Sequence, residues 1–268
     1  MSIDVSDRAL EILAPTLIGF MKRYDDVRYA LAGSGTFVSV GEIKGILTAA
    51  HVLDVLPQGP IGAMVFSRPS RRMNYKIQVY ESDKVYLSGW KETKALPDIG
   101  FLRIAREECA RLEGLGCVFH DLTKPRTHFD HSDGAADTQR FVCGVVGESA
   151  EEGGMYAGAD TIGYTSLAIA AKNIRWQKDG LAEIEPDFDE HVRAPESYKG
   201  VSGGGFWSLG FYKKHGSEEL LSERKLVGVA FRQTQITEAG RTIFCQSGMT
   251  LQADLMNAIY AAFDGPPP

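Results

Sequence analysis

The 268-residue sequence contains no apolar run of membrane-spanning length, and its first residues do not combine a basic segment with an uninterrupted apolar stretch. It therefore predicts neither a transmembrane helix nor a signal peptide. Basic clusters are also missing, since the short Arg71-Arg72 pair does little to offset a formal net charge of −6. This acidic balance argues against nucleic acid and anionic membranes as partners, and it favours a neutral or cationic soluble partner.

Cysteine is scarce, and the four that occur have neither disulfide-framework nor metal-ligand spacing. They lie among apolar residues at Cys109, Cys117, Cys143 and Cys245. We expect these thiols to be reduced and buried, as in a cytoplasmic protein.

A standard zinc pattern is also missing. Residues 105–140 are polar and irregular, and they include His120, His128 and His131 with aspartates between them. Because the spacing of these histidines fits no standard zinc site, we expect a solvated loop and a domain boundary here. No metal and no cofactor is predicted.

The sequence does contain a series of short β-rich runs. Six of them occur between residues 35 and 104 and five more between residues 140 and 246, with Gly, Pro and Asn between them. This spacing predicts an all-β chain built as barrels or a sandwich, rather than the alternating strands and helices of a parallel sheet.

Apolar residues recur at helical spacing over residues 6–23 and again over residues 251–263. We expect the first of these helices to pack on the body of the protein as a brace. The alternative is that it docks a regulatory protein partner.

The glycine-rich segment Gly200-Val201-Ser202-Gly203-Gly204 is the main candidate for a functional site. Glycine lets the backbone turn sharply and approach a substrate closely. If Ser202 is a nucleophile, the N–H groups of Gly200 and Ser202 are the nearest donors for the oxyanion that its attack creates. The motif alone also matches the nucleophile elbow of α/β-hydrolases, a plain tight turn or a phosphate-binding nest.

Two further residues supply what a nucleophilic serine needs. His51 ends the segment Thr48-Ala-Ala-His51, and Asp98 opens the apolar segment Asp98-Ile-Gly-Phe-Leu about 47 residues later. A buried carboxylate without a partner is costly, so His51 is a candidate partner for Asp98. On its own, a histidine in this setting is more often structural.

In their order of His, Asp and Ser, these three segments resemble the signature segments of the trypsin/chymotrypsin family of serine peptidases. The segment Lys225-Leu-Val-Gly-Val-Ala-Phe231 resembles the strand that lines the substrate cleft in that family, and the resemblance spans roughly residues 29–264. It implies two antiparallel six-stranded β-barrels with an added helix at each end. The domains that it implies are an N-terminal helical extension (1–28), a first barrel (29–124), a second barrel (125–250) and a C-terminal helix with its tail (251–268).

The order of the segments argues against the α/β-hydrolase interpretation, which needs serine, then acid, then histidine. The only histidine after Ser202 is His215, and no alternation of strands and helices surrounds it.

The resemblance implies a serine endopeptidase, in particular a regulated processing protease that acts on protein or peptide substrates. Ser202 would attack the scissile carbonyl, and His51 would take its proton and give it to the leaving amine. Asp98 would fix the imidazole tautomer, and the N–H groups of Gly200 and Ser202 would hold the oxyanion.

The sequence departs from the family at Val201, where secreted relatives carry an aspartate that pairs with a freshly cut N-terminus. We therefore do not expect trypsin-type zymogen activation. By count from the nucleophile, Glu196 would lie at the bottom of the primary pocket and favour Lys or Arg, or else it would face water. Phe231 and Arg232 are expected to contact an extended substrate, and Arg232 would alternatively select acidic side chains.

Two other functions stay open. One is a catalytically silent domain that binds peptides in the same cleft, and the other is an acyl hydrolase or esterase with the same triad. The complete set of His, Asp and Ser favours catalysis, because binding alone does not require a base, an acid and a nucleophile.

Overall fold

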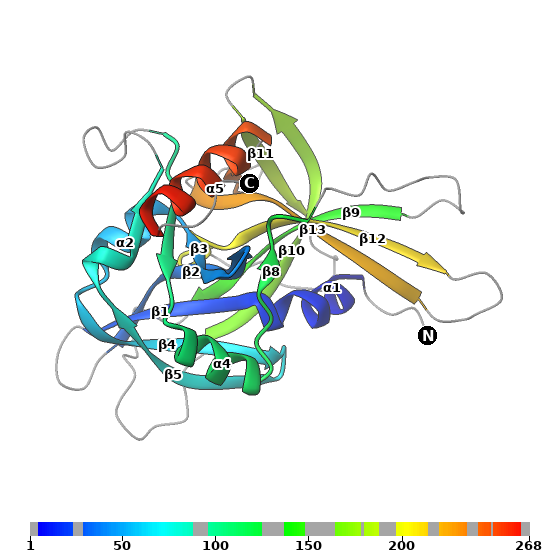
Figure 1. Ribbon diagram of the computed structural model, residues 1–268. Helices are drawn as coiled ribbons and strands as arrows, with labels where there is room; N and C mark the ends of the chain where they lie inside the picture. The colour runs from blue at the N-terminus through cyan, green and yellow to red at the C-terminus, as the bar shows by residue number, and fades with distance from the viewer. Residues whose placement is uncertain are drawn as a thin grey trace.

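The computed structural model describes residues 5–23, 29–87, 96–124, 137–147, 164–177, 180–187, 197–213, 220–234, 241–247 and 249–263. Two β-sheets make up most of these residues, and helices lie near both ends of the chain (Figure 1). None of the helices in these ranges is long and apolar enough to cross a membrane.

The first sheet is built from the N-terminal half of the chain. Its strands are β1 (Leu17–Arg23), β2 (Tyr29–Val40), β3 (Ile43–Thr48), β4 (Gly59–Arg68), β5 (Arg71–Val79), β6 (Lys84–Tyr86), β7 (Gly100–Arg103) and β8 (His120–Asp121). Seven strands pair antiparallel in the order β5-β4-β1-β2-β3-β7-β6, and β8 pairs in parallel with β2. The helix α2 (Ala50–Val55) follows β3, and α4 (Arg106–Gly114) follows β7.

The second sheet closes on itself as a six-stranded barrel. Its strands are β9 (Asp137–Gly147), β10 (Tyr164–Trp176), β11 (Leu181–Asp187), β12 (Gly205–Lys213), β13 (Leu220–Gln233) and β14 (Ile243–Ser247). Their order around the barrel is β10-β11-β14-β13-β12-β9, and antiparallel pairing of β9 with β10 closes the ring.

These two sheets confirm the predicted all-β class, and the architecture is consistent with a chymotrypsin-like double barrel. The first sheet differs in detail from the six-stranded barrel that was expected. It has eight strands, and no pairing within the described residues joins its outer strands β5 and β6.

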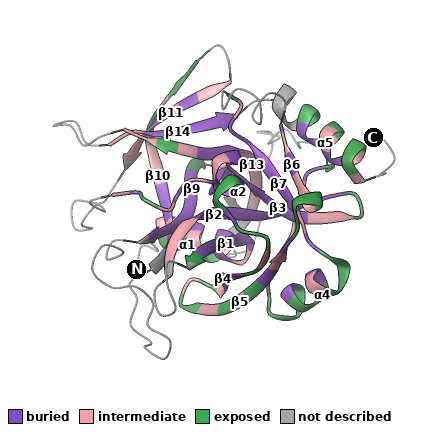
Figure 2. Cartoon of the chain, turned by 90° about the vertical axis from the view of Figure 1, so that its left-hand side faces the viewer, coloured by how far each residue is buried: buried purple, intermediate pink, exposed green. Residues whose placement is uncertain are grey.

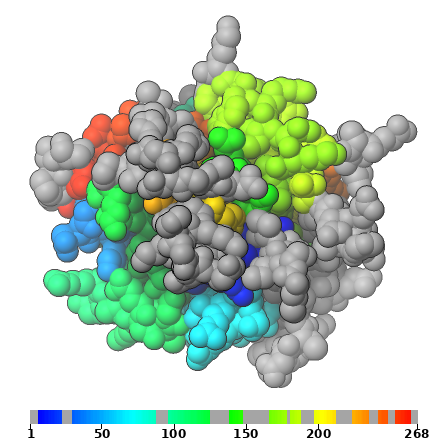
Figure 3. Space-filling model, turned by 90° about the vertical axis from the view of Figure 1, so that its right-hand side faces the viewer, coloured from blue at the N-terminus to red at the C-terminus, as the bar shows by residue number. Residues whose placement is uncertain are grey.

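A shared hydrophobic core joins the two sheets. It takes Phe66 and Phe101 from the first sheet and Phe141 and Trp207 from the second, all of them at most 1% exposed. Buried positions follow the inner faces of the strands, whereas α4 and α5 (Met249–Phe263) turn exposed residues outward (Figure 2). Figure 3 shows the opposite side of the molecule, with the β10–β11 region in yellow-green and the β4–β5 region in cyan.

The N-terminal segment corrects one prediction. The helix α1 covers only Val5–Leu13, a 3-10 turn follows at Ala14–Thr16, and Leu17–Arg23 form strand β1. A single helix over residues 6–23 is therefore wrong, because Pro15 cannot donate a backbone hydrogen bond and β1 gains pairing from both β2 and β4. Strand β1 thus joins the first sheet, although residues 1–28 were predicted to be a separate extension.

Two elements were missed in segments that the sequence predicts to be irregular. Helix α4 occupies residues 106–114 and buries Cys109 and Leu112, which lie three residues apart on one face. Strand β11 occupies residues 181–187, an acidic segment whose composition is not typical of a strand. Its buried Ala182 and Ile184 alternate with glutamates that face outward, so the acidic charge hid an amphipathic strand.

Candidate active site

His51 and Asp98 form a closely bonded pair. The Nδ1 atom of His51 lies 2.6 Å from Oδ2 of Asp98, and the backbone N–H of His51 donates to Oδ1 of Asp98 at 3.0 Å. The Asp98 side chain is 8% exposed and the His51 side chain 39% exposed. An acceptor at Nδ1 favours the tautomer with its proton on Nδ1, which leaves Nε2 as the free base on the exposed side of the pair.

The fold brings this pair together across two neighbouring strands. Thr48 at the end of β3 pairs with Gly100 at the start of β7, so the residues that follow β3 lie beside those that precede β7. A Cβ atom on Gly100 would lie 2.6 Å from Leu53 Cδ1 and 3.4 Å from Ala50 Cα, so glycine leaves room for the close approach of α2. This close packing places the helix that carries His51 in hydrogen-bonding contact with Asp98.

Ser202 lies in a tight turn between two glycines with left-handed backbone conformation. The φ angles are +99° at Gly200 and +89° at Gly203, values that favour glycine. A Cβ atom on Gly203 would lie 2.0 Å from both the Ser34 carbonyl oxygen and Thr48 Oγ1. The turn thus packs closely against strands β2 and β3, which precede His51 in the chain.

The Ser202 hydroxyl has its own hydrogen bond. It donates to the carbonyl oxygen of Phe231 on β13 at 3.1 Å. Within the described part of the chain, no hydrogen bond joins this hydroxyl to His51, although both residues line the same cleft. Ser202 and the imidazole of His51 thus lie around the same cleft, with the Phe231 carbonyl of β13 bonded to the serine.

The backbone of this turn leaves two N–H groups available. The N–H of Val201 donates to the carbonyl of Tyr198 at 3.0 Å, and that of Gly203 donates to Ala230 at 2.6 Å. For the N–H groups of Gly200 and Ser202, no acceptor is present among the residues that the structure describes. These two N–H groups lie on either side of Val201, and an oxyanion hole requires two such donors directed at one point.

The cleft itself has a volume of about 210 Å³ and lies between the two sheets. Its walls include His51, Gly200 and Ser202, together with Leu31 from β2 and Ile243 from β14. Burial raises the pKa of the nearby Tyr198 phenol to about 12, so this side chain stays neutral at physiological pH.

Two cations also line the cleft, Lys199 and Arg232. The guanidinium of Arg232 lies over the Phe244 ring, 5.2 Å from its centroid, and makes no ion pair with any described residue. The lining residues of the cleft include no carboxylate. Its described part is therefore cationic.

The other predicted site residues have different outcomes. Phe231 contributes its carbonyl to Ser202 and packs its ring on the core of the first sheet. Glu196 lies outside the described residues, as do His128 and His131. His120 is described, and its ring packs edge-on against Trp207 with 5.0 Å between centroids. No group of described residues has the composition of a metal site.

Sequence reasoning missed Ser34, a fully buried serine of β2 that bonds to the carbonyl of Gly200. It also missed Gln233, whose side-chain oxygen accepts from the N–H of Tyr198 at 2.8 Å and so supports the loop before Ser202. The only signal at Ser34 is that a polar residue stands between Gly33 and Gly35, just before an apolar run.

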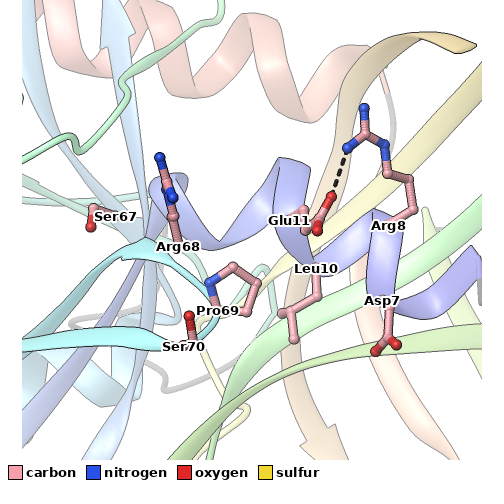
Figure 4. Close-up of a pocket in the computed structure, with 8 residues that line it drawn as sticks. All are labelled: Asp7, Arg8, Leu10, Glu11, Ser67, Arg68, Pro69 and Ser70. Atoms are coloured by element: carbon pink, nitrogen blue, oxygen red, sulfur yellow. Dashed lines mark hydrogen bonds and ion pairs between the residues drawn. The ribbon is translucent and has the colours of Figure 1, made fainter. Parts of the chain in front are cut away.

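A second, larger hollow lies away from these residues, between α1 and the β4–β5 turn (Figure 4). Its volume is about 740 Å³, and its walls carry an ion pair of 2.6 Å between Arg8 and Glu11. Its walls include neither a histidine nor a cysteine. The smaller cleft therefore remains the candidate active site.

Comparison with known proteins adds little to this description. No protein-family model matches the chain. No curated protein sequence matches it. Among solved structures, one match comes from the study "Aromatic interactions drive the coupled folding and binding of the intrinsically disordered Sesbania mosaic virus VPg protein". It has a TM-score of 0.43 and 14% sequence identity, and it covers 93% of this chain and 88% of that chain.

Proposed function

We propose that this chain is a serine endopeptidase that cleaves peptide bonds through Ser202, His51 and Asp98. The observation that carries the proposal is that a bonded His–Asp pair and a serine in a glycine turn open on one cleft. The two free N–H groups of Gly200 and Ser202 add a binding site for negative charge beside the serine. Nucleophile, base, orienting acid and oxyanion donors are then all present.

The chemistry begins with rotation of the Ser202 side chain away from the Phe231 carbonyl and toward Nε2 of His51. The serine oxygen attacks the scissile carbonyl carbon while His51 takes the hydroxyl proton, and Asp98 stabilises the resulting imidazolium. The carbonyl oxygen becomes an oxyanion held by the N–H groups of Gly200 and Ser202. His51 then gives its proton to the leaving amine, and water hydrolyses the acyl-enzyme by the same steps in reverse.

The Phe231 carbonyl has a second role in this proposal. Once Ser202 turns toward His51, that carbonyl is free to accept the backbone N–H of an extended substrate lying beside β13. Substrate binding and activation of the serine thereby become linked, because both require Phe231 to lose its bond to Ser202.

The charge of the cleft indicates a substrate class. Lys199 and Arg232 line it, so we propose that substrates carry an acidic side chain near the scissile bond. A preference for Lys or Arg set by Glu196 remains the competing prediction. The charged lining is compatible with a soluble protein or peptide as substrate.

The N-terminal helix is proposed to act as a brace rather than as a partner site. Its Ala9 and Leu13 are fully buried in the shared core. A regulatory partner of this helix would bind the outer face of α1. A cytoplasmic location stays a prediction from the four free, buried thiols.

A catalytically silent peptide-binding domain is the second candidate, and the bond from Ser202 to Phe231 is the observation that favours it. A peptide library incubated with the wild type and with Ser202→Ala and His51→Ala separates the two functions. An endopeptidase produces new N-termini with the wild type alone. Peptides that bind equally to all three proteins without being cut would establish the silent domain instead, and cleavage of esters without cleavage of peptides would indicate an esterase.

A further inference from the structure

The buried serine Ser34 connects both sheets to the turn that carries Ser202. It lies on β2 and has no exposed surface. Its hydroxyl donates to the Gly200 carbonyl at 2.6 Å and accepts from the Val145 N–H of β9 at 2.8 Å. Its backbone N–H donates to the Ser202 carbonyl at 2.7 Å. Ser34 of the first sheet is thus hydrogen-bonded to strand β9 of the second sheet and to two carbonyls of the turn that carries Ser202.

The same residue also reaches the strand that leads to His51. The Thr48 hydroxyl donates to the Ser34 carbonyl at 2.6 Å, and His51 follows three residues later. Ser34 is therefore hydrogen-bonded both to the turn that carries Ser202 and to the end of the strand that precedes His51. A shift of this residue would change the distance between Ser202 and His51.

The bond to the Gly200 carbonyl fixes the peptide plane that lies between the two proposed oxyanion donors, the N–H groups of Gly200 and Ser202. That carbonyl shares a peptide plane with the N–H of Val201, which is bonded on the opposite side to Tyr198 at 3.0 Å. With both ends held, the plane between Gly200 and Val201 cannot rotate. The preceding plane is held less tightly, because the Lys199 carbonyl accepts from Gly147 at 3.4 Å. The orientation of the Gly200 N–H thus depends on the plane that Ser34 anchors.

Packing around this network leaves it little room to adjust. An added Cβ on Gly203 would lie 2.0 Å from the Ser34 carbonyl oxygen, and one on Gly144 would lie 3.3 Å from the Ser34 hydroxyl. A Cβ on Gly33 would approach the Ser202 carbonyl oxygen to 3.0 Å. Because close-packed interiors respond to small changes, we expect the loss of this hydroxyl to disturb the bonds around it.

We infer that Ser34 is a positioning residue of the oxyanion hole, which acts on the reaction through the Gly200–Val201 peptide without touching the substrate. The inference rests on the proposed serine-peptidase function for its catalytic consequence. Its structural half, that the Ser34 hydroxyl holds this peptide, does not depend on that function. Ser34→Ala removes the hydroxyl and leaves the Gly200 carbonyl and the Val145 N–H without their partner.

The test compares Ser34→Ala with Ser39→Ala, a second buried serine on the same strand that lies away from the turn. On a cleaved peptide, we expect Ser34→Ala to lower kcat about 10- to 100-fold with KM changed less than about threefold, since misplacing an oxyanion donor costs less than deleting it. Ser39→Ala should keep the kcat of the wild type. A fall in kcat shared by both variants, or a change confined to KM, would overturn the inference.

A second readout needs no activity. Hydrogen exchange at the Val201 amide reports whether the Gly200–Val201 peptide is held, and we expect it to be at least about tenfold faster in Ser34→Ala. Thr48→Val is the matched control. It removes a buried hydrogen bond to the Ser34 carbonyl but leaves the bond from the Ser34 hydroxyl to the Gly200 carbonyl. Unchanged exchange at Val201 in Ser34→Ala would contradict the inference. If the wild type proves inactive, the proposed function fails while this measurement still decides the role of Ser34.

Discussion

The hydroxyl of Ser202 donates to the carbonyl oxygen of Phe231 at 3.1 Å, so the proposed nucleophile is bonded to the strand that would receive a substrate. The same carbonyl is the acceptor that an extended peptide would use beside β13. In the proposed mechanism the serine exchanges this bond for one to His51 when a substrate takes its place.

Asp98→Asn should lower kcat by about 10⁴-fold, the size of effect seen for the equivalent change in the serine-peptidase template. An amide at this position can donate to Nδ1 of His51, which favours the tautomer with its proton on Nε2 and leaves no base for Ser202. Steady-state kinetics on a cleaved peptide measure the effect. The matched control is Asp83→Asn, which alters a carboxylate bonded to Arg103 of β7. Equal losses in the two variants would show that Asp98 serves stability rather than catalysis.

Arg232→Gln should lower kcat/KM by about tenfold for peptides with an acidic residue near the scissile bond. The substitution removes one charge-assisted contact with the substrate, and a tenfold loss corresponds to about 1.4 kcal/mol. Neutral peptides should be affected little. Arg175→Gln, which removes an exposed arginine paired with Glu183, is the control. A wild-type profile that selects Lys or Arg would reject this substrate class and support the Glu196 prediction.

Gly203→Ala should destabilise the protein more than Gly59→Ala. Both residues have positive φ angles, +89° and +100°, so each substitution carries a backbone strain of about 1–2 kcal/mol. Only at Gly203 does the new methyl group meet atoms, at 2.0 Å from the Ser34 carbonyl oxygen and Thr48 Oγ1, whereas nothing lies within 4 Å at Gly59. Urea unfolding of the two variants gives the difference, which we expect to exceed about 1 kcal/mol. Equal losses would mean that the turn around Ser202 is loosely packed.

His120 should make the folded state less stable as the pH falls below 6.5. Burial, followed by the charge of Arg224, lowers the pKa of His120 to about 4, whereas the unfolded chain titrates near 6.5. Between these values the unfolded state binds more protons, so the free energy of unfolding rises with pH by about 2–3 kcal/mol. The contribution of His120 is fully present above pH 6.5 and is lost as the pH falls toward 4. Denaturant unfolding from pH 4 to pH 7 should therefore show a shallower slope for His120→Gln than for the wild type. Parallel slopes would assign the pH dependence to other groups.

The sequence was informative where function depends on short local segments. His51, Asp98 and Ser202 each stand in a segment whose glycines or small residues are needed for a close approach, so their types and order could be recognised without a structure. Ser34 could not be found in this way. Its importance comes from hydrogen bonds to Val145 and Gly200, which lie 111 and 166 residues away along the chain.

Secondary structure was mispredicted where tertiary pairing overrides local pattern. Residues 17–23 continue a helical spacing, yet they lie between two strands and pair with both. In β11, the buried Ala182 and Ile184 alternate with more exposed glutamates, but these two apolar positions are too few to show the alternation among the charged residues. The mostly polar helix α4 buries only two residues of its nine, so its periodicity was too weak to read.

The most direct test of the proposed function is labelling with a fluorophosphonate, which reacts covalently with an activated serine. We predict that the wild type is labelled, that mass spectrometry places the adduct on Ser202, and that His51→Ala and Ser202→Ala both abolish it while remaining folded. A folded wild type that takes up no label at any pH between 6 and 9, or an adduct on another residue that persists in Ser202→Ala, would contradict the assignment of this cleft as a serine-peptidase active site.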